Sequence, residues 1–436
     1  MKTKIHTDMM RLLKQMENPY LRAIDLQLVR MVNLMNAIGR PDKKLPPVIH
    51  VAGTNGKGSL MAYLRAIYEE AGKAVHVYTS PHLVRFNERI VLAGKEVEDA
   101  ELYDALRRVH QLNQQFPATL FEAVTAAAFI LFAKHKADLM LVEVGMGGRL
   151  DATNVLEHPA VSMITPVSID HSEYLGKDIA AIAREKAGIM KKDVPCVIGP
   201  QSEAAMALLS AHALKVGTPL MRYGIEWHLE KRGESYWYKS DSLELELPKP
   251  SLAGTHQWQN AATAVAAVDV LNRDVMKIDQ TVIQSGIPKA FWEGRLQQLS
   301  GKWLDGLPAG SEVWLDGGHN PAAGEILAQW AKERWQEPQL HMVSGMLKGK
   351  DVRGFLTPLA PLTKHLWAVP IHDEPNALMP GELEHKAKNM GMKANTAHHV
   401  REALQYIGES SDKNTPQNIL ITGSLYLVGQ VIAEGV

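Results

Sequence analysis

The sequence has a single cysteine and no long apolar run. Cys196 has no second cysteine to pair with, which excludes an internal disulfide framework and predicts a reducing compartment, the cytoplasm. The N-terminal stretch lacks an apolar core long enough for a secretory signal. The most apolar segment, residues 123–133, is too short to span a bilayer, so we expect no membrane partner.

Neither sign of charge is in excess. Lys and Arg total 47 and Asp and Glu total 48, which gives a net charge of −1. A nucleic-acid-binding protein would carry a basic excess, so we expect no nucleic-acid partner. The 436 residues, 46% of them hydrophobic, are enough for two or more domains. The sequence also lacks coiled-coil heptads, and we expect a monomer.

Apolar, β-branched runs alternate with helical patterns along most of the chain. The predicted helices cover residues 58–71, 98–115, 121–136, 178–190, 202–216 and, in an alanine-rich stretch, 256–271. The predicted strands are PVIHVAG, AVHVYTS, DLMLVEVG, AVSMITPVS, PCVIGP, EVWLDGG, QLHMVSG, HLWAVPI and NILITGS. This alternation predicts an α/β protein with parallel sheets covered by helices.

The alternation is interrupted once and then restarts. Residues 222–248 predict short antiparallel strands that decorate a first domain. We predict a P-loop-type nucleotide-binding domain with a mostly parallel sheet over residues 1–296, and a smaller, Rossmann-like α/β domain over 297–436. Ligands of open α/β sheets bind at the carboxyl ends of the strands, so the loops there are where chemistry is expected.

The first such loop lies in VIHVAGTNGKGSLMAYL, residues 48–64, between a predicted strand and a predicted helix. Its glycines let backbone N–H groups approach an anion, and the following helix presents its positive end. The standard signature G-x-x-x-x-G-K-[ST] is not matched in full, because Gly58 separates Lys57 from Ser59. The alternatives are therefore a phosphate cradle and a plain turn.

Three further loops place polar side chains where catalysis is expected. Glu143 ends an apolar strand, a position suited to Mg²⁺. Asp170 and His171 follow the next strand, and Lys186 lies on the helix after that loop. Each of these residues alone is explained by a solvated or hydrogen-bonded side chain. Their succession within one alternating domain favours a functional site.

Eight motifs in order resemble the folylpolyglutamate synthase and dihydrofolate synthase family, part of the Mur-type ATP-dependent amide ligases. The resemblance covers nearly the whole chain, from about residue 20 to 430. The motifs are HVAGTNGKGS, YTSPHLVRFNERI, FEAVTAAAF, LVEVGMGGRLDATN, DHSEYLG, REKAGIM, WEGRLQ and LDGGHNP. The resemblance implies that ATP and Mg²⁺ activate a carboxylate as an acyl phosphate, which an amino acid then attacks. It also implies two domains that close on each other.

The resemblance implies roles for residues around the nucleotide. The ATP-binding residues would be Gly53, Thr54, Asn55, Gly56, Lys57, Gly58, Ser59, Asn260, Arg295, Asp316 and His319. Ser80, Glu143, His171 and Lys186 would hold metal, with two Mg²⁺ ions expected. Lys186 resembles the lysine that many relatives carry as a carbamate.

Four of these residues are expected to act in catalysis: Lys57, His171, Lys186 and Arg295. The guanidinium of Arg295 suits a phosphoryl group. The other interpretation of Arg295 is a salt bridge near the domain boundary.

The resemblance also implies the acid and the amine. Arg85, Phe121, Arg149 and Asp151 would bind the pterin substrate, although Phe121 also fits an ordinary helix core. Ser424 and His319 are candidates for L-glutamate. GRLDATN resembles bacterial members that use dihydropteroate as well as reduced folate, so both activities are expected.

Two other functions compete with this one. A cell-wall ligase acting on a nucleotide-sugar precursor shares the phosphate loop, but TSPHL, FNERI and GRLDATN argue against it, as do the fewer than 50 residues before the loop. An NTPase switch would hydrolyse ATP without an acceptor and form no bond.

Overall fold

The computed structural model describes residues 2–16, 26–112, 115–335 and 339–435. The chain divides into two compact units, and each contains its own sheet. The first comprises residues 1–167, 178–251 and 258–291, and the second comprises residues 168–177, 252–257 and 292–436. The α/β class and the mostly parallel sheets predicted from sequence are confirmed.

The first unit is built on a sheet that, in the described residues, has eight strands in the order β4-β3-β2-β5-β1-β6-β7-β8. All neighbouring pairs from β2 to β8 are parallel, and β3 and β4 form an antiparallel edge. The bounds are β1 (Val48–Ala52), β2 (Val75–Tyr78), β3 (Ile90–Leu92), β4 (Lys95–Glu96), β5 (Leu139–Glu143), β6 (Val161–Ile164), β7 (Cys196–Ile198) and β8 (Leu220–Arg222).

Helices cover this sheet because parallel strands require crossovers. Apolar residues of α1, α2, α4 and α5 share one core with Val48, Tyr78 and Met140 of the sheet. The helices are α1 (Lys2–Met16), α2 (Leu28–Ala37), α3 (Lys57–Glu70), α4 (Asp99–Leu112), α5 (Leu120–Lys134), α7 (Ile179–Ala187), α8 (Glu203–Val216), α9 (His256–Asp274) and α10 (Gln280–Gly286), with 3₁₀ turns η1 (Pro41–Lys44), η2 (Phe86–Arg89), η3 (Ala152–Val155) and η4 (Ile287–Lys289).

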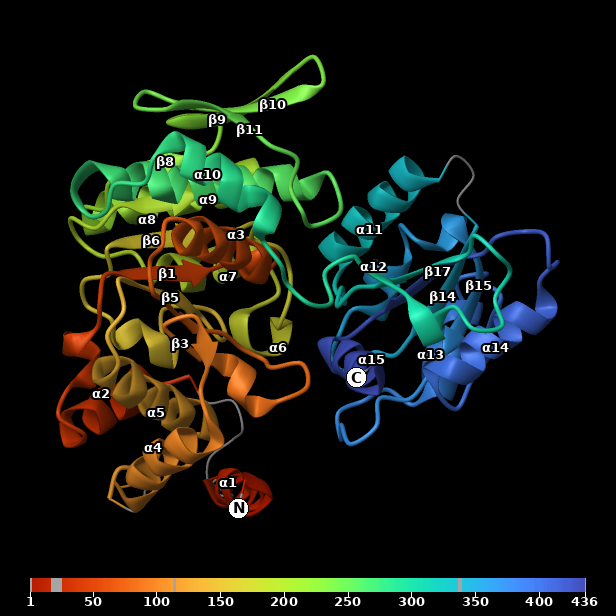
Figure 1. Ribbon diagram of the computed structural model, residues 1–436, viewed down its shortest axis with the longest axis horizontal. Helices are drawn as coiled ribbons and strands as arrows, with labels where there is room; N and C mark the ends of the chain where they lie inside the picture. Colours follow the sequence, from red (N-terminus) through yellow and green to blue (C-terminus); the bar gives the residue numbers. More distant parts are fainter. Residues whose placement is uncertain (1, 17–25, 113–114, 336–338, 436) are drawn as a thin grey trace. The chain divides into compact units, whose positions relative to one another are not determined.

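Residues 113–114 of the predicted helix 98–115 lie outside the described residues. The predicted antiparallel strands are present as β9 (Trp227–Arg232), β10 (Ser235–Ser240) and β11 (Glu244–Leu247), which Figure 1 shows beside α9 and α10. No described helix is long and apolar enough to span a membrane.

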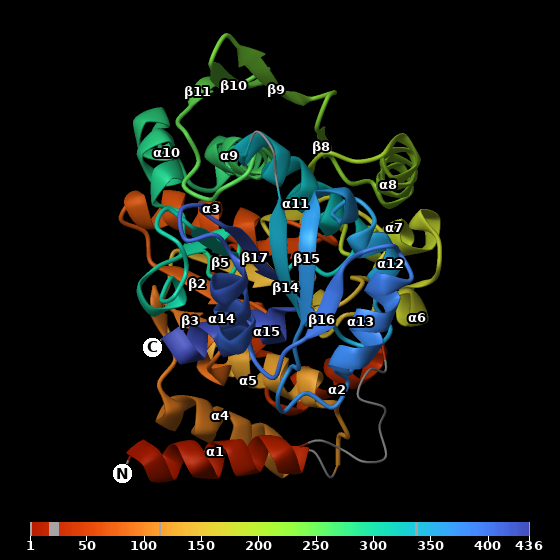
Figure 2. The same ribbon diagram turned by 90° about the vertical axis from the view of Figure 1, so that its right-hand side faces the viewer.

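The second unit has a six-stranded sheet among its described residues, ordered β12-β13-β17-β14-β15-β16, with β12 antiparallel and the rest parallel. Figure 2 shows β14 and β15 at its centre. The strands are β12 (Gln297–Leu299), β13 (Glu312–Leu315), β14 (Leu340–Ser344), β15 (Thr363–Ala368), β16 (Ala394–Thr396) and β17 (Asn418–Thr422). The helices are α6 (Ser172–Leu175), α11 (Pro321–Arg334), α12 (Val352–Leu356), α13 (Pro380–Lys388), α14 (Val400–Ser410) and α15 (Leu425–Gly435), with η5 (Gly301–Trp303) and η6 (Ala360–Leu362).

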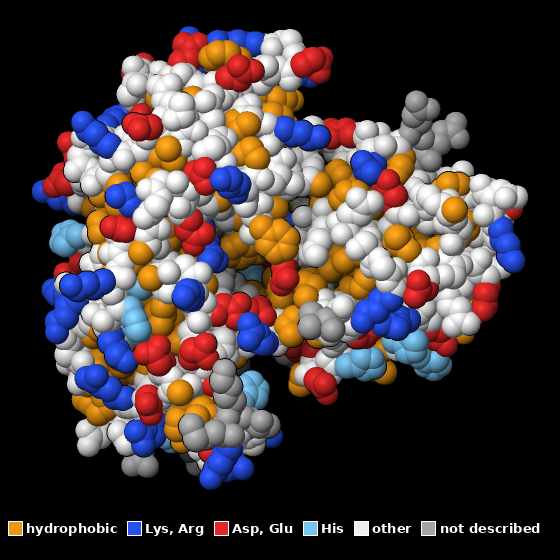
Figure 3. All heavy atoms as spheres, viewed as in Figure 1, with side chains coloured by type: hydrophobic (Ala, Val, Ile, Leu, Met, Phe, Trp, Pro, Cys, Tyr) orange, Lys and Arg blue, Asp and Glu red, His pale blue; other side chains and the backbone are white. Residues whose placement is uncertain are grey.

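The surface carries both signs of charge. On the face drawn in Figure 3, Lys and Arg side chains are interspersed with Asp and Glu. This mixture agrees with the net charge of −1. A broad single-sign field, which would attract a polyanion, is not seen on this face of the described residues.

Candidate active site

The loop between β1 and α3 is held in a close-packed conformation. Gly53 has φ +148°, and a Cβ there would lie 1.7 Å from the hydroxyl oxygen of Thr165. The N–H groups of Thr54 and Asn55 donate to the carbonyl of Pro166 at 3.0 and 3.4 Å. These contacts fix the loop to the segment after β6, and only glycine fits at Gly53.

The helix after the loop begins at a second constrained glycine. Gly56 is the N-cap of α3 with φ +88°, and a Cβ there would lie 2.9 Å from the side-chain oxygen of Asn260. Asn260 itself is buried on α9. The first turn of α3, which contains Lys57, Gly58 and Ser59, provides helix N–H groups that lack intrahelical acceptors. This turn is therefore suited to bind phosphate oxygens.

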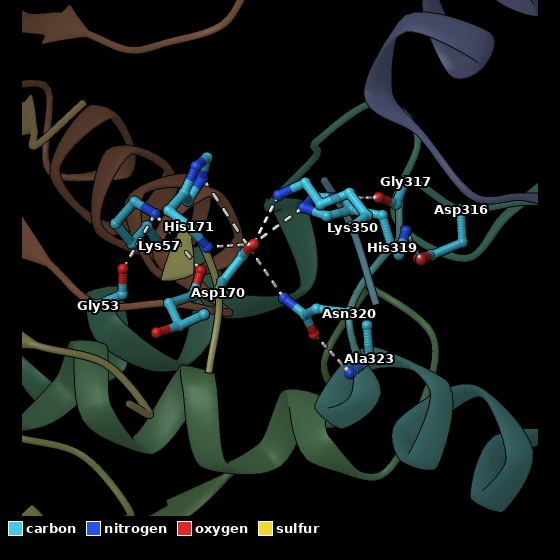
Figure 4. Close-up of polar contacts among 12 residues, drawn as sticks. Gly53, Lys57, Asp170, His171, Asp316, Gly317, His319, Asn320, Ala323 and Lys350 are labelled. Atoms are coloured by element: carbon cyan, nitrogen blue, oxygen red, sulfur yellow. Dashed lines mark hydrogen bonds and ion pairs between the residues drawn. The ribbon is translucent and has the colours of Figure 1, made fainter. Parts of the chain in front are cut away.

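Two lysines converge on the carbonyl of Gly53. The amino group of Lys57 lies 3.2 Å from it and 3.5 Å from the carbonyl of Thr54 (Figure 4). Lys186, buried on α7, donates to the same Gly53 carbonyl at 2.8 Å. The structure thus brings together two cations that are 129 positions apart in the sequence (186 minus 57). They surround the loop with positive charge.

Glu143 ends β5, between the carboxyl ends of β1 and β2. One of its carboxylate oxygens accepts hydrogen bonds from the hydroxyl of Thr79 and from the N–H of Ser80, the latter at 3.2 Å. The other oxygen lies 3.8 Å from the Lys57 amino group. Thr79, which sequence reasoning missed, orients this carboxylate. The sequence YTSPHL does not show whether the hydroxyl of Thr79 or that of Ser80 would face Glu143.

The described residues contain no group of three or more His, Cys, Asp or Glu side chains that would hold a metal ion alone. Glu143 and the neighbouring Ser80 offer oxygen donors, the type that Mg²⁺ prefers. Mg²⁺ in nucleotide sites is usually bound by one or two carboxylates together with phosphates and water. The donor set therefore fits a nucleotide-bound Mg²⁺.

The segment after β5 contains Arg149 and Asp151, two of the four residues predicted to bind the pterin. Asp151 is buried and caps η3, where it accepts hydrogen bonds from Thr153 and from the N–H of Met146. Burial raises the pKa of Asp151, and these hydrogen bonds oppose the rise. Phe121, half-buried at the start of α5, lies against Gly145, where a Cβ would be 2.4 Å from its ring.

The two arginines predicted for this site are exposed and ion-paired. Arg85 pairs with Glu96, beside η2. Arg149 donates from two nitrogens to one carboxylate oxygen of Glu185, at 3.0 and 2.8 Å. Exposed pairs of this type contribute about 0–1 kcal/mol, so either arginine is able to exchange its partner for a substrate carboxylate.

In the second unit, the carboxylate of Asp170 accepts from the N–H of the adjacent His171 at 2.8 Å and also gathers three partners from distant parts of the sequence (Figure 4). Lys350 binds one oxygen at 2.6 Å, and His319 and Asn320 each lie 3.3 Å from the other. Burial alone would raise the pKa of Asp170, but the hydrogen bond from His319 and the charges of His319, Lys350 and His171 lower it well below its ordinary range. His171, with φ +50°, follows directly at the N-cap of α6.

Arg295, Asp316 and Ser424 are in the same unit. Asp316 is half-buried and accepts from the N–H groups of Leu296 and Gly318 at 3.0 and 2.7 Å. Burial raises the pKa of Asp316, and the charge of Arg295 opposes the rise. Ser424 is buried just before α15, and its hydroxyl accepts from the N–H of Tyr426 at 3.1 Å.

Sequence reasoning missed the partners Lys350 and Asn320. They lie 180 and 150 positions from Asp170, so only the folded chain brings them together. The available signal was local: Lys350 is in SGMLKGKD, a glycine-rich segment after a buried strand. Asn320 caps α11 by accepting from the N–H of Ala323 at 3.0 Å, a role typical of its residue type.

Two family models match this chain, described as Mur ligase middle domain over residues 51–268 and as Dihydrofolate synthetase, C-terminal domain, over residues 308–434. The dihydrofolate synthase/folylpolyglutamate synthase of Bacillus subtilis is 34% identical over 420 residues, covering 93% of this chain and 94% of the relative.

Solved structures are similar over nearly the whole length. E. coli FolC in complex with DHPP and ADP has a TM-score of 0.87 at 30% identity, covering 98% of this chain and 97% of that one. A bifunctional folylpolyglutamate synthase/dihydrofolate synthase with Mn, AMPPNP and L-glutamate bound has a TM-score of 0.82 at 31% identity, with 95% of each chain covered.

Proposed function

The chain belongs to the folylpolyglutamate synthase and dihydrofolate synthase family, and from this membership we propose the reaction that it catalyses. It is an ATP-dependent ligase that joins L-glutamate to reduced folate, and also to dihydropteroate. Solved relatives bind ADP or AMPPNP, Mn and L-glutamate, which supports ATP, a divalent metal and glutamate as its small-molecule partners. The observation that carries the proposal is the loop of Gly53, on which Lys57 and Lys186 converge beside Glu143.

The chemistry proceeds in two steps. A carboxylate oxygen of the folate or dihydropteroate attacks the γ-phosphorus of ATP, and ADP leaves. The amino group of glutamate, after losing a proton, attacks the resulting acyl phosphate, and inorganic phosphate leaves as the amide forms. Phosphoryl transfer of this type depends on positioning and on neutralising charge.

We propose that residues 53–59 and Asn260 bind the nucleotide, and that Lys57 neutralises charge on the transferred phosphoryl group. Arg295 offers a planar guanidinium to the phosphoryl group, and Asp316 and His319 contact the nucleotide. The amino group of Lys57, 3.2 Å from the Gly53 carbonyl, supports these roles in the first unit. In the second unit, the pairing of His319 with Asp170 supports a fixed orientation of its imidazole.

We propose two Mg²⁺ ions, with Ser80, Glu143, His171 and a carbamate on Lys186 as protein ligands. Bound Mg²⁺ would neutralise phosphate charge and orient the γ-phosphoryl group. The buried Lys186 amino group supports the carbamate, since conversion to an anionic oxygen ligand suits a position beside a metal.

We propose that Phe121 stacks on the pterin and that Asp151 accepts hydrogen bonds from its amide and amino groups. Arg85 and Arg149 bind carboxylates of the substrate. The exposure of both arginines and the buried, oriented carboxylate of Asp151 support these assignments. Use of dihydropteroate rests on the segment GRLDATN and on relatives that have both activities.

We propose residues 1–296 as the ATP- and pterin-binding domain and 297–436 as the glutamate-side domain. Ser424 and His319, with the neighbouring Lys350, are the candidates for binding L-glutamate. The cation and hydrogen-bond donors around Asp170 support this choice, because they suit a carboxylate. The enzyme is proposed to act as a monomer in the cytoplasm.

An isotope-transfer experiment tests the acyl phosphate. Dihydropteroate labelled with ¹⁸O in its carboxylate is incubated with ATP, Mg²⁺ and L-glutamate. One labelled oxygen is expected in the inorganic phosphate, because the carboxylate oxygen remains on phosphorus when the amide forms. Unlabelled phosphate together with amide product would contradict the mechanism.

A further inference from the structure

A buried histidine of β1 has no role in the reaction described so far. His50 lies three positions before Gly53, within HVAGTNGKGS, and its side chain is fully buried. Its strand neighbours are Val142 of β5 and Ser162 of β6, so it is in the middle of the sheet. A polar side chain at such a position is costly unless it is hydrogen-bonded.

The partner of His50 is Thr153, 103 positions away, in the segment proposed to bind the pterin. The Nε2 atom of His50 lies 2.8 Å from the hydroxyl oxygen of Thr153. That hydroxyl donates to the Oδ1 atom of Asp151. Asp151 also accepts from the N–H of Thr153 at Oδ1 and from the N–H of Met146 at Oδ2, at 2.9 and 3.0 Å.

These contacts determine the direction of the hydrogen bonds. Both oxygens of Asp151 accept N–H groups, as an ionised carboxylate does. The single hydroxyl proton of Thr153 therefore points to Asp151, and its oxygen accepts a proton from Nε2 of His50. In the opposite tautomer, Nε2 would compete with Asp151 for that proton. Burial and the charge of Lys191 lower the pKa of His50 to about 3, so the ring stays neutral near neutral pH.

We propose that His50 is a positioning residue that orients the carboxylate of Asp151 for the pterin ring through the hydroxyl of Thr153. The protein donates to Asp151 from the hydroxyl and the N–H of Thr153 and from the N–H groups of Met146 and Gly145. These donors hold the carboxylate in one orientation, in which it would accept an N–H of the pterin ring. The inference rests on the proposed function, because the pterin is its ligand.

Steady-state kinetics of paired variants test the proposal. In His50→Gln the amide nitrogen takes the place of Nε2, whereas in His50→Asn it takes the place of Nδ1 and cannot reach Thr153. We expect the KM for dihydropteroate to rise about tenfold or more in His50→Asn and to change much less in His50→Gln. The KM for ATP should stay within about twofold in both variants. The proposal would be overturned if His50→Asn changed the KM for dihydropteroate and the KM for ATP equally, or if it changed neither KM.

Two controls separate positioning from stability. His76→Gln alters another buried histidine of the same sheet, which bonds to the carbonyl of His135 rather than to the pterin segment. It should lower the Tm without raising the KM for dihydropteroate. Where His50 variants fail to fold, Thr153→Val should raise that KM and Thr153→Ser should preserve it. A high KM for dihydropteroate in Thr153→Ser would contradict the proposal that the hydroxyl of residue 153 links His50 to Asp151.

A spectroscopic measurement does not depend on catalysis. In ¹⁵N-histidine NMR of the wild type, the resonances absent from His50→Gln identify His50. The Nε2–H tautomer is expected, and an Nδ1–H tautomer would overturn the proposal even in an active ligase. Absence of ligation by the wild type, in contrast, would refute the proposed function.

Discussion

At the scale of single residues, the site depends on close approaches that sequence patterns suggest only in part. The glycines, Lys57 and Glu143 were predicted from their places after strands, because parallel strands end at one edge of a sheet. The hydroxyl of Thr79 and the pairing of Lys350 with Asp170 were not predicted. They depend on rotamers and on contacts between distant segments, which periodicity does not encode.

Gly53→Ala tests the closest of these approaches. The new methyl group would overlap the hydroxyl of Thr165, so we expect the unfolding free energy to fall by about 1–3 kcal/mol and ATP binding to weaken. Gly381→Ala is the matched control, because a Cβ there has no neighbour within 4 Å. Thermal melting and ADP titration measure both effects. A wild-type Tm and wild-type ADP affinity in Gly53→Ala would show that the loop accommodates a Cβ at residue 53.

Asp170→Asn tests the carboxylate that binds Lys350, His319 and Asn320. Since the native pKa of Asp170 lies below its ordinary value of 3.8, ionised Asp170 stabilises the fold above that pH. The stabilisation is lost as pH falls through the native pKa. The Tm difference between wild type and Asp170→Asn should therefore be constant from about pH 8 to 5 and narrow below about pH 4. If the Tm difference between wild type and Asp170→Asn grew as pH fell, the lowered pKa of Asp170 would be contradicted.

At the scale of elements, the nine strands named from apolar runs are all present, whereas β3, β4, β8, β12 and β16 were not predicted. The missed strands have two or three residues each, too few to show an alternating pattern.

The three-stranded sheet β9–β11 was predicted as a decoration of the first domain, but the way in which it is attached was not predicted. Asp269 of α9, buried, accepts from the hydroxyls of Tyr238, Ser240 and Ser242, at 3.0, 2.7 and 2.8 Å.

Asp269→Ala tests this attachment. Three hydroxyls would lose a charged acceptor, so we expect a loss of about 3 kcal/mol in unfolding free energy. Asp241→Ala, an exposed position of the same hairpin, should change stability by less than about 0.5 kcal/mol. Thermal melting monitored by circular dichroism compares the two variants. Equal Tm values would mean that Asp269 does not hold the sheet to α9.

At the scale of the whole molecule, the chain passes between its units more than once. Residues 168–177, which include Asp170 and His171, cluster with the second unit, although the chain before and after them belongs to the first. A division at one sequence position was the natural prediction, because a composition break marks only one boundary. The contacts of Asp170 with His319 and Lys350, which no sequence pattern indicates, join this segment to the second unit.

Calorimetry tests whether the two units unfold separately. We expect two transitions, since each unit has its own sheet and core. Asp269→Ala should lower one transition and Asp170→Asn the other, because the two residues belong to different units. A single transition that both substitutions lower equally would show one cooperative unit.

The central claim is that ATP is consumed to form an amide. The most direct measurement is ADP release with Mg²⁺ and L-glutamate in the presence of dihydropteroate, tetrahydrofolate or no acceptor, with the amide product quantified by mass spectrometry. The account predicts one ADP per amide with either acceptor and little ADP without one. Equal ADP release in the absence of any acceptor, with no amide formed, would contradict it.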